Sequence, residues 1–382
     1  MKRLSITNLR DQKKAIVCHL AMTVILLGTV SPVTFAQESI GDIVLNLDPS
    51  TENPRNSEGD FVQLRDGRIL FIYTHFTGGG SDHATAHLAS RESADSGRTW
   101  STESKDVIPN DGDMNIMSVS LLRLQSGDIG LFYLRKNSRQ DCRMLMRRSN
   151  DEGTTWSDET ICTNPPEYYV VNNDRVVQLE DGRLLVPAAR HKWTDKNQLL
   201  PAEAICFLSD DDGNTWRPST TVLPVIPNSR TGHQEPGVVA LPDGRLWMYT
   251  RTDKGVQYQS YSDDGGDTWS DAEPSTIHSP VAPASVAPVP DTGQLLMVWN
   301  DHTTISEELK GKRTPLAIAI SDDAGKTWPR HTIIEDEPLG WYCYTAIEIV
   351  GKHVLLAYCA GDKTIGGLNR TRIRRIALDA IQ

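Results

Sequence analysis

The chain has 382 residues, of which 38% are hydrophobic and 23% are charged, and its formal net charge is −11. This acidic balance argues against a nucleic-acid-binding protein, because phosphates are bound by clusters of Lys and Arg. The length exceeds that of a usual single-core domain, but it suits an architecture that grows by repetition.

The first 36 residues have the composition of a cleavable secretory signal peptide. Five basic residues lie within positions 2–14, and a mostly apolar run follows from Ala15 to Ala36, with small residues at Thr34 and Ala36 as signal peptidases prefer. A retained membrane anchor is the alternative, and it is disfavoured because Gly28 and Pro32 shorten the apolar core. We therefore expect a secreted or periplasmic protein. Its mature chain, residues 37–382, has a formal charge of −15, because cleavage removes five basic residues and one acidic residue.

Five cysteines follow the predicted cleavage site, in a compartment where disulfides can form. Two pairs are spaced symmetrically about predicted turns, Cys142 with Cys162 and Cys343 with Cys359, whereas Cys206 has no such partner. Either pair could be bridged. Buried free thiols are an equally good interpretation, because spacing does not test the geometry that a disulfide needs.

An eight-residue phrase of the type Ser-Asp-Asp-Asp-Gly-Asn-Thr-Trp occurs five times, with starts 56, 60, 53 and 59 residues apart. Such a period is typical of a repeat architecture. In every copy the Asp at the third position can accept backbone N–H groups of a tight turn, the Gly at the fifth permits positive φ, and the Trp at the eighth supplies an apolar anchor. A calcium loop is disfavoured, because one fixed Asp provides too few oxygen ligands. The copies begin at Ser93, Ser149, Ser209, Ser262 and Ser321.

A second recurring unit precedes each phrase and occurs once more near the C-terminus: two apolar strands joined by a turn that usually contains Asp-Gly. Its six copies are residues 61–73, 121–133, 176–187, 238–249, 286–299 and 347–358. Each hairpin, with one strand entering the repeated turn and one leaving it, makes a four-stranded sheet. Six such sheets arranged radially form an all-β, six-bladed β-propeller, which residues 42–47 are expected to close by pairing with the last sheet. An open solenoid is less favoured, because the chain ends lack polar caps.

This topology sorts the loops onto two faces. The repeated turns and the hairpin turns share one face, so the other face receives the residues before strand one, after strand two and at the start of strand three. Polar side chains gather at these positions, and the candidates are Arg55, Glu58, Asp82, Glu235, Arg251, Arg313 and Tyr344.

These residue types suit the binding and hydrolysis of an acidic substrate. Converging arginines form a rigid, permanently charged fork for a carboxylate. A Tyr beside a Glu can act as a nucleophile, and a separate Asp can act as acid and base. No cluster has zinc-like spacing, so we expect no catalytic metal and no cofactor. Further candidates for polar contacts with a ligand at this face are Asn173, Arg190, His191, Trp193 and His233.

The repeated phrase resembles the Asp-box, or BNR repeat, of the sialidase (neuraminidase) superfamily, and the resemblance spans essentially the whole mature chain. The segment from Glu235 to Arg251 is similar to the Glu-to-Arg hairpin of that family. Arg313 has a placement similar to that of the third family arginine, and the Tyr344-Thr-Ala-Ile sequence resembles the Tyr-Ser-Ser-Leu context of the family nucleophile. Asp82 lies where the family has its acid/base loop.

The resemblance implies an exo-α-sialidase-like retaining glycoside hydrolase that removes terminal sialic (nonulosonic) acid from glycans. The arginines would hold the sugar carboxylate, Tyr344 would attack the anomeric carbon with Glu235 as its base, and Asp82 would protonate the leaving oxygen. Sialidases with a Tyr nucleophile depart from the usual scheme of two carboxylates. Tyr342, expected on the same strand face as Tyr344, is an alternative nucleophile.

Two features set the chain apart within this resemblance. The usual Arg-Ile-Pro at the first arginine is replaced by Arg55-Asn-Ser-Glu58, which indicates a divergent branch. Glu58 is an additional acid that either contacts substrate or pairs with an arginine. Two alternative functions therefore stay open: a hydrolase or lyase acting on another acidic sugar such as a uronate, and a non-catalytic glycan-binding propeller.

Overall fold

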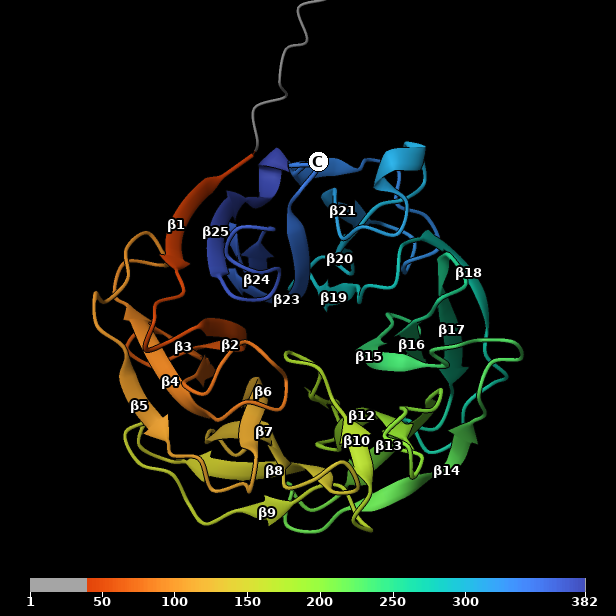
Figure 1. The fold of residues 1–382 in the computed structure, drawn as a ribbon, viewed down its shortest axis with the longest axis horizontal. Coiled ribbons are helices and arrows are strands. Elements are labelled where there is room, and N and C mark those ends of the chain that lie inside the picture. The colour runs from red at the N-terminus through yellow and green to blue at the C-terminus, as the bar shows by residue number, and fades with distance from the viewer. Residues whose placement is uncertain (1–39, 382) are drawn as a thin grey trace, which may run out of the picture. The chain divides into compact units, whose positions relative to one another are not determined.

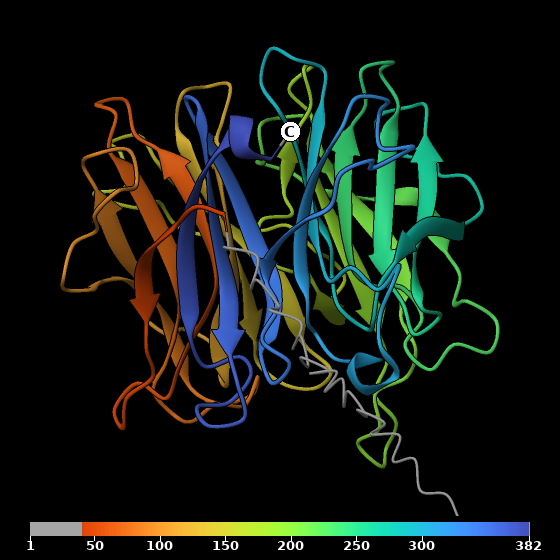
Figure 2. The same ribbon diagram turned by 90° about the horizontal axis from the view of Figure 1, so that it is seen from above.

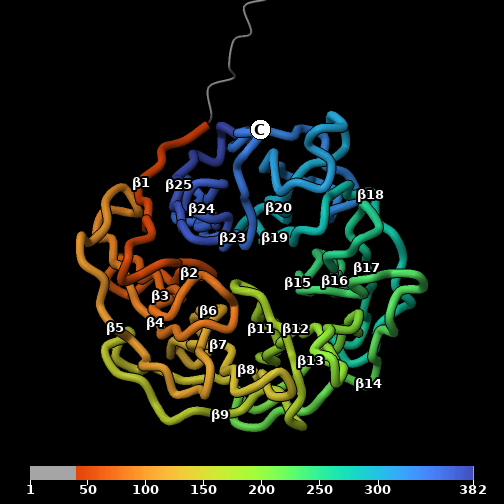
Figure 3. The backbone as a smooth tube through the Cα atoms, in the orientation of Figure 1, coloured from red at the N-terminus to blue at the C-terminus, as the bar shows by residue number. Residues whose placement is uncertain are grey.

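Residues 40–381 are the part of the chain that the computed structural model describes. The regular secondary structure of this part is almost entirely β, with 25 strands and two short 3-10 turns at Glu307–Leu309 and Leu378–Ala380. Its sheets follow one another in chain order around a central axis (Figures 1 and 3). Figure 2 shows the connecting loops gathered at the two ends of the strands. No helix within residues 40–381 is long and apolar enough to span a membrane, and the predicted signal peptide lies outside the described residues.

Four of the sheets have four strands each, paired with their neighbours in antiparallel order. The first contains β2 (Arg55–Gln63), β3 (Ile69–Phe76), β4 (Ala86–Ser93) and β5 (Lys105–Ile108). The next two contain β15 (Gln234–Ala240), β16 (Leu246–Arg251), β17 (Val256–Ser262) and β18 (Glu273–His278), then β19 (Ser285–Pro288), β20 (Leu295–Trp299), β21 (Leu316–Ser321) and β22 (Thr332–Glu335). The fourth contains β23 (Trp341–Val350), β24 (His353–Gly361), β25 (Thr371–Ala377) and β1 (Asp42–Leu47).

The remaining strands of the described part form one nine-stranded sheet where the sequence predicts two separate four-stranded sheets. The short strand β10 joins the two halves, because it pairs antiparallel with β12 and meets β8 through a parallel contact of Tyr168 with Cys142. The structure therefore shows five hydrogen-bonded sheets. The nine strands are β6 (Asn115–Arg123), β7 (Ile129–Lys136), β8 (Cys142–Ser149), β9 (Thr160–Ile161), β10 (Tyr168–Val170), β11 (Val177–Gln178), β12 (Leu184–His191), β13 (Glu203–Ser209) and β14 (Arg217–Leu223).

The predicted pairing of residues 42–47 with the last sheet is confirmed. Strand β1 runs antiparallel to β25, with Asp42 opposite Arg375 and Leu47 opposite Thr371. The two strands lie side by side in Figure 1 although they come from opposite ends of the described chain. This pairing ties the first described strand to the C-terminal hairpin without any covalent link.

The five repeated phrases make the same hydrogen bonds. In the third copy, the Asp211 carboxylate accepts the backbone N–H of Thr215 at 2.8 Å and its hydroxyl at 2.6 Å. Gly213 has φ of +82°, and its N–H donates to the Ser209 hydroxyl at 2.7 Å. The equivalent Asp-to-Thr contacts recur at Asp95, Asp151, Asp264 and Asp323. The turn chemistry that the letters of the phrase predict is thus present in each copy.

The hydrophobic core is divided among the interfaces between neighbouring sheets. Ile72 of β3 and Leu131 of β7 share one cluster, and Phe71 of the same strand β3 shares another with Leu355 of β24. This division follows from the alternation of side chains along a strand, which gives each sheet two buried faces. All five described cysteines are buried free thiols, so neither candidate pair is bridged.

Candidate active site

Four inner strands carry the same irregularity near one end. Glu58, Ser118, Glu235 and Tyr344 have φ of +53°, +59°, +46° and +59°, and the pairing register of their strands shifts at these residues. Positive φ is uncommon for residues other than glycine, and a bulge redirects the side chain that it displaces. Such strained positions cluster at functional sites. Three of the four are residues that the sequence nominates.

Tyr344 and Glu235 form the centre of the site, from strands β23 and β15. The Tyr344 hydroxyl donates to Glu235 Oε1 at 3.1 Å, and Arg251 donates from Nη1 to Glu235 Oε2 at 2.7 Å. Burial alone would raise the pKa of Glu235, but the guanidinium groups of Arg251 and Arg313 hold it below its usual value. Burial and the adjacent Glu235 carboxylate raise the pKa of Tyr344. The resting pair is therefore a neutral phenol beside an ionised carboxylate.

The prediction that Tyr342 shares a face with Tyr344 is wrong. Tyr342 is buried in the hydrophobic cluster between the last two sheets, with its ring centroid 6.5 Å from that of Tyr358. The bulge at Tyr344 breaks the alternation of the strand, so two residues of separation no longer place both rings on one face. The structure thus separates the two candidate nucleophiles.

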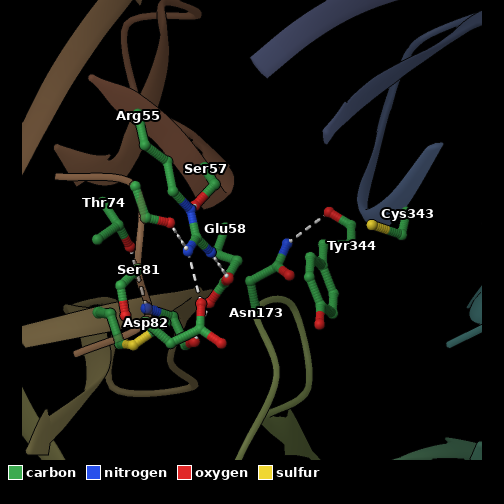
Figure 4. A network of polar contacts seen from close by, with 12 residues as sticks. Arg55, Ser57, Glu58, Thr74, Ser81, Asp82, Asn173, Cys343 and Tyr344 are labelled. Atoms are coloured by element: carbon green, nitrogen blue, oxygen red, sulfur yellow. Dashed lines mark hydrogen bonds and ion pairs between the residues drawn. The ribbon is translucent and has the colours of Figure 1, made fainter. Parts of the chain in front are cut away.

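Arg55 forms a second group with two carboxylates (Figure 4). Its Nη2 donates to Glu58 Oε1 at 2.6 Å, and its Nη1 donates to Asp82 Oδ1 at 2.5 Å. The other oxygen of Glu58 accepts the hydroxyl of Ser118. Burial raises the pKa of Glu58. Burial acts in the same direction at Asp82, but Arg55, with smaller contributions from Lys136 and His83, holds the pKa of that carboxyl below its usual value. Glu58 therefore pairs with an arginine, one of the two roles expected for it.

Arg313 lies behind Tyr344 and is 7% exposed. Its Nη1 donates to Cys343 Sγ at 2.8 Å, and its guanidinium carbon lies 5.2 Å from the ring centroids of both Tyr344 and Trp341. Within residues 40–381 it forms no ion pair with a carboxylate, unlike Arg55 and Arg251. Arg313 is thus the least neutralised of the three expected arginines.

One cavity of about 280 Å³ connects these groups. Five of the expected residues line it, namely Glu58, Asp82, Glu235, Arg251 and Tyr344. Arg55 and Arg313 are not in its lining, because Arg55 is fully buried beside Glu58 and Arg313 lies beneath the Tyr344 ring. His191 and Trp193, two of the further candidates, also face this cavity.

The structure does not bring Arg190 and His233 to the cavity. Arg190 precedes the cavity-lining His191 on strand β12, so its side chain leaves the opposite face of the strand and donates to Glu203 Oε2 at 2.7 Å. His233 is 1% exposed, and its Nδ1 lies 2.9 Å from the hydroxyl of Thr250. Burial lowers the pKa of His233 to about 4. Their expected substrate contacts are therefore not supported by their positions.

Asn173 has a structural position instead of a place on the rim. It is fully buried, and its amide nitrogen donates to the backbone oxygens of Gly59 at 2.9 Å and Tyr344 at 3.1 Å (Figure 4). Asn173 therefore ties together the bulges that carry Glu58 and Tyr344.

Several lining residues were not expected from the sequence. Lys136 is the last residue of β7, as Arg251 is the last residue of β16. The criterion that predicts Arg251 at this face, a polar residue at the end of the second strand of a unit, therefore also applies to Lys136. The apolar part of the lining has no such signal, because it is drawn from the long strands β6 and β7 as well as from the short strand β10 and from loops. The additional residues include Met117, Ser118, Leu134, Lys136, Tyr168, Val170, Asn172, Leu199 and Gln234.

The chain is similar to sialidases in sequence. It is 29% identical to a sialidase of Clostridium perfringens over 261 residues, which are 61% of this chain and 65% of that protein. It is 26% identical to a sialidase of Bacteroides fragilis over 254 residues, which are 63% of this chain and 41% of that protein. The chain therefore spans less than two thirds of the length of either relative.

Solved structures at lower identity share the fold. The NanB sialidase of Streptococcus pneumoniae superimposes with a TM-score of 0.68 at 15% identity, covering 90% of this chain and 71% of that chain. A protein of unknown function from Dyadobacter fermentans superimposes with a TM-score of 0.71 at 16% identity, covering 89% and 98%. The profile of the BNR repeat-like domain family matches residues 114–355, more than half of the chain. Together with the sialidase relatives, this match shows that the chain belongs to the sialidase superfamily, as a member with BNR repeats.

Proposed function

We propose that this protein is an exo-α-sialidase-like retaining glycoside hydrolase that removes terminal sialic acid, or another nonulosonic acid, from glycans. One observation carries the proposal: the Tyr344 hydroxyl is hydrogen-bonded to the Glu235 carboxylate in a cavity that Asp82 also lines. A neutral phenol paired with a base suits attack beside a substrate carboxylate, because an anionic nucleophile would be repelled there. The sialidase relatives support the same class of reaction.

In the proposed reaction, the oxygen of Tyr344 attacks the anomeric carbon while Glu235 accepts the phenolic proton. The bond to the leaving glycosidic oxygen breaks, and Asp82 supplies the proton to that oxygen. Water then attacks the anomeric carbon of the Tyr-linked intermediate, with Asp82 accepting its proton, and the phenolic oxygen leaves with the proton held by Glu235. Two displacements at one carbon retain its configuration.

The charges around the cavity suit one anionic group on the substrate. The charged groups that line the cavity or lie directly behind its lining give one net positive charge when all are ionised. The basic groups are Arg55, Lys136, Arg251 and Arg313, and the carboxylates are Glu58, Asp82 and Glu235. We propose that Arg55, Arg251 and Arg313 hold the sugar carboxylate. Asp82 would leave Arg55 as the carboxylate arrives, and loss of that ion pair would raise the pKa of Asp82 toward the value that a general acid needs.

The number of blades and the role of the N-terminal segment are also part of the proposal. We interpret the nine-stranded sheet as two blades linked by β10, which gives a six-bladed β-propeller with five Asp-boxes over residues 37–382. We propose that residues 1–36 direct export to the periplasm or the medium, where sialylated glycans would be the substrates.

An aryl α-sialoside tests the activity directly. The mature protein should release the aryl alcohol, and proton NMR of the first sugar product should show the α-anomer. Inversion would contradict the double displacement. Cleavage of uronate-containing glycans alone would favour the other acidic-sugar enzyme, and binding of sialic acid without any turnover would favour a glycan-binding module.

A further inference from the structure

Lys136 is a basic side chain at the cavity to which neither the repeats nor the family resemblance assigns a task. It is the last residue of β7, is 4% exposed, and lines the cavity. Its ammonium donates to the backbone oxygen of Asp82 at 2.8 Å and approaches Met117 Sδ at 3.4 Å. Within residues 40–381 it forms no ion pair with a carboxylate. The nearly buried Lys136 ammonium, which has three donors, therefore makes its strongest hydrogen bond to the backbone oxygen of Asp82.

The Asp82 peptide is held from one neighbouring sheet by two side chains. Asn115, at the start of β6, donates from Nδ2 to the same Asp82 oxygen at 3.0 Å and to Ala84 O at 2.8 Å. Asp82 itself lies in a glycine-rich loop, and its carboxylate is 55% exposed at the cavity. The loop is thus anchored through its main chain from this sheet, and its carboxylate is paired separately with Arg55.

We propose that Lys136 is a positioning residue for Asp82: by holding the Asp82 peptide oxygen from the wall of the cavity, its ammonium places the acid/base carboxyl over the glycosidic bond and sets the pH at which it can donate a proton. This inference rests on the proposed function of Asp82. It extends that function, because it assigns control of the acid/base group to a neighbouring strand.

The electrostatics of the loop agree with this role. The Lys136 charge contributes to lowering the pKa of Asp82, after the larger contribution of Arg55. Loss of the Lys136 charge should therefore raise the pKa of Asp82. The titratable and charged groups that face Asp82 from the surrounding elements are Arg55, Glu58, His83, Lys136 and Tyr168.

Three substitutions separate the hydrogen bond from the charge. Lys136→Met removes both, Lys136→Gln keeps a donor without the charge, and Lys136→Arg keeps both. Arg135→Met is a matched control, because Arg135 is the preceding residue of β7 and its side chain pairs with Glu159 at 2.5 Å, away from the cavity. It also removes one positive charge from the same strand.

Two substrates report on the acid step. Sialyllactose needs its leaving oxygen protonated, whereas a 4-nitrophenyl α-sialoside has a leaving group that departs unaided. Lys136→Met should lower kcat/KM for sialyllactose at least about tenfold more than for the aryl substrate, since general acid catalysis contributes about 10² to 10⁴. The alkaline limb of its pH profile, where Asp82 loses its proton, should move to higher pH by up to about one unit. Compared with Lys136→Met, Lys136→Gln should have a higher kcat/KM for sialyllactose but the same shifted pH profile. Lys136→Arg should have both a kcat/KM and a pH profile close to those of the wild type.

Equal losses on both substrates with an unshifted pH profile would overturn the inference, as would an unchanged Lys136→Met enzyme. If the wild-type protein cleaves neither substrate, the proposed function is wrong. The effect of Lys136 on Asp82 can then still be tested by a measurement that needs no turnover. Carbon-13 NMR titration of the Asp82 carboxyl needs no turnover, and it should show a higher pKa in Lys136→Met than in the wild type and in Arg135→Met. Equal pKa values in all three proteins would refute the inference.

Discussion

Substitution of Arg313 by Lys tests the carboxylate-binding role of the least neutralised arginine. Arg55 and Arg251 already donate to carboxylates of the protein. Within residues 40–381 Arg313 has no such ion pair; it donates to Cys343 Sγ and lies against the rings of Tyr344 and Trp341. Under the proposed function, its remaining N–H groups would donate to the sugar carboxylate, although Arg313 is not part of the cavity lining in this structure. Lysine keeps the charge and loses the planar fork that matches a carboxylate.

The expected loss is that of a charge-assisted hydrogen bond in a nearly buried position. Arg313 is 7% exposed, so solvent replaces little of the lost contact. Hydrogen bonds to charged groups contribute about 1.5 to 3 kcal/mol. At about 1.4 kcal/mol for each factor of ten, Arg313→Lys should weaken binding of sialic acid by about 10-fold to 150-fold.

Isothermal titration calorimetry with free sialic acid measures this loss. Arg190→Lys is the matched control, because Arg190 pairs with Glu203 outside the cavity and its substitution should leave the affinity unchanged. The difference between Arg313→Lys and the wild type should disappear for an analogue whose carboxylate is reduced to an alcohol. An affinity for sialic acid within about twofold of the wild type would refute the assigned contact, since a lost charge-assisted bond costs more. So would an equal loss for the analogue.

Three further perturbations address the nucleophile, the repeated turns and two half-buried acids. Tyr344→Phe should abolish turnover while sialic acid binds within about tenfold of the wild type, because only the covalent step is lost; wild-type turnover in this variant would remove Tyr344 as nucleophile. Asp211→Ala should lower the free energy of unfolding by about 1 to 2 kcal/mol in urea titrations, because an exposed turn loses its acceptor for the Thr215 N–H, and kcat/KM should not change; a loss of activity at unchanged stability would contradict a purely structural turn. Burial raises the pKa of Asp174 to about 7 and that of Glu348 to about 8, so the folded chain holds protons that the unfolded chain releases above about pH 4, and stability should fall as the pH rises from there to about 8. In thermal unfolding across this range, the Tm of Glu348→Gln should depend less on pH than the Tm of the wild type. An equal dependence of Tm on pH in the two proteins would contradict the raised pKa of Glu348.

The repeats and turns of this protein could be predicted from the sequence because their chemistry is local. The Asp, Gly and Thr that build each repeated turn lie within eight residues of one another, so spacing along the chain is enough to recognise them. Strand periodicity then determines which ends of the strands share a face. The sequence therefore predicts Asp82, Glu235, Arg251 and Tyr344 on one face, and these four residues do line one cavity.

Only the tertiary structure decided which side chains near the strand ends point into that cavity. The bulge at Tyr344 sends its ring to the cavity and leaves Tyr342 in the core, although strict alternation would place them together. Arg190 and Lys136 show that a place near a strand end is not enough. Arg190 lies on the face of β12 opposite the cavity-lining His191, whereas Lys136 ends β7 at the cavity. The physical reason is that the place of a bulge and the direction of a loop are fixed by contacts from other sheets, which the linear order of residues does not contain.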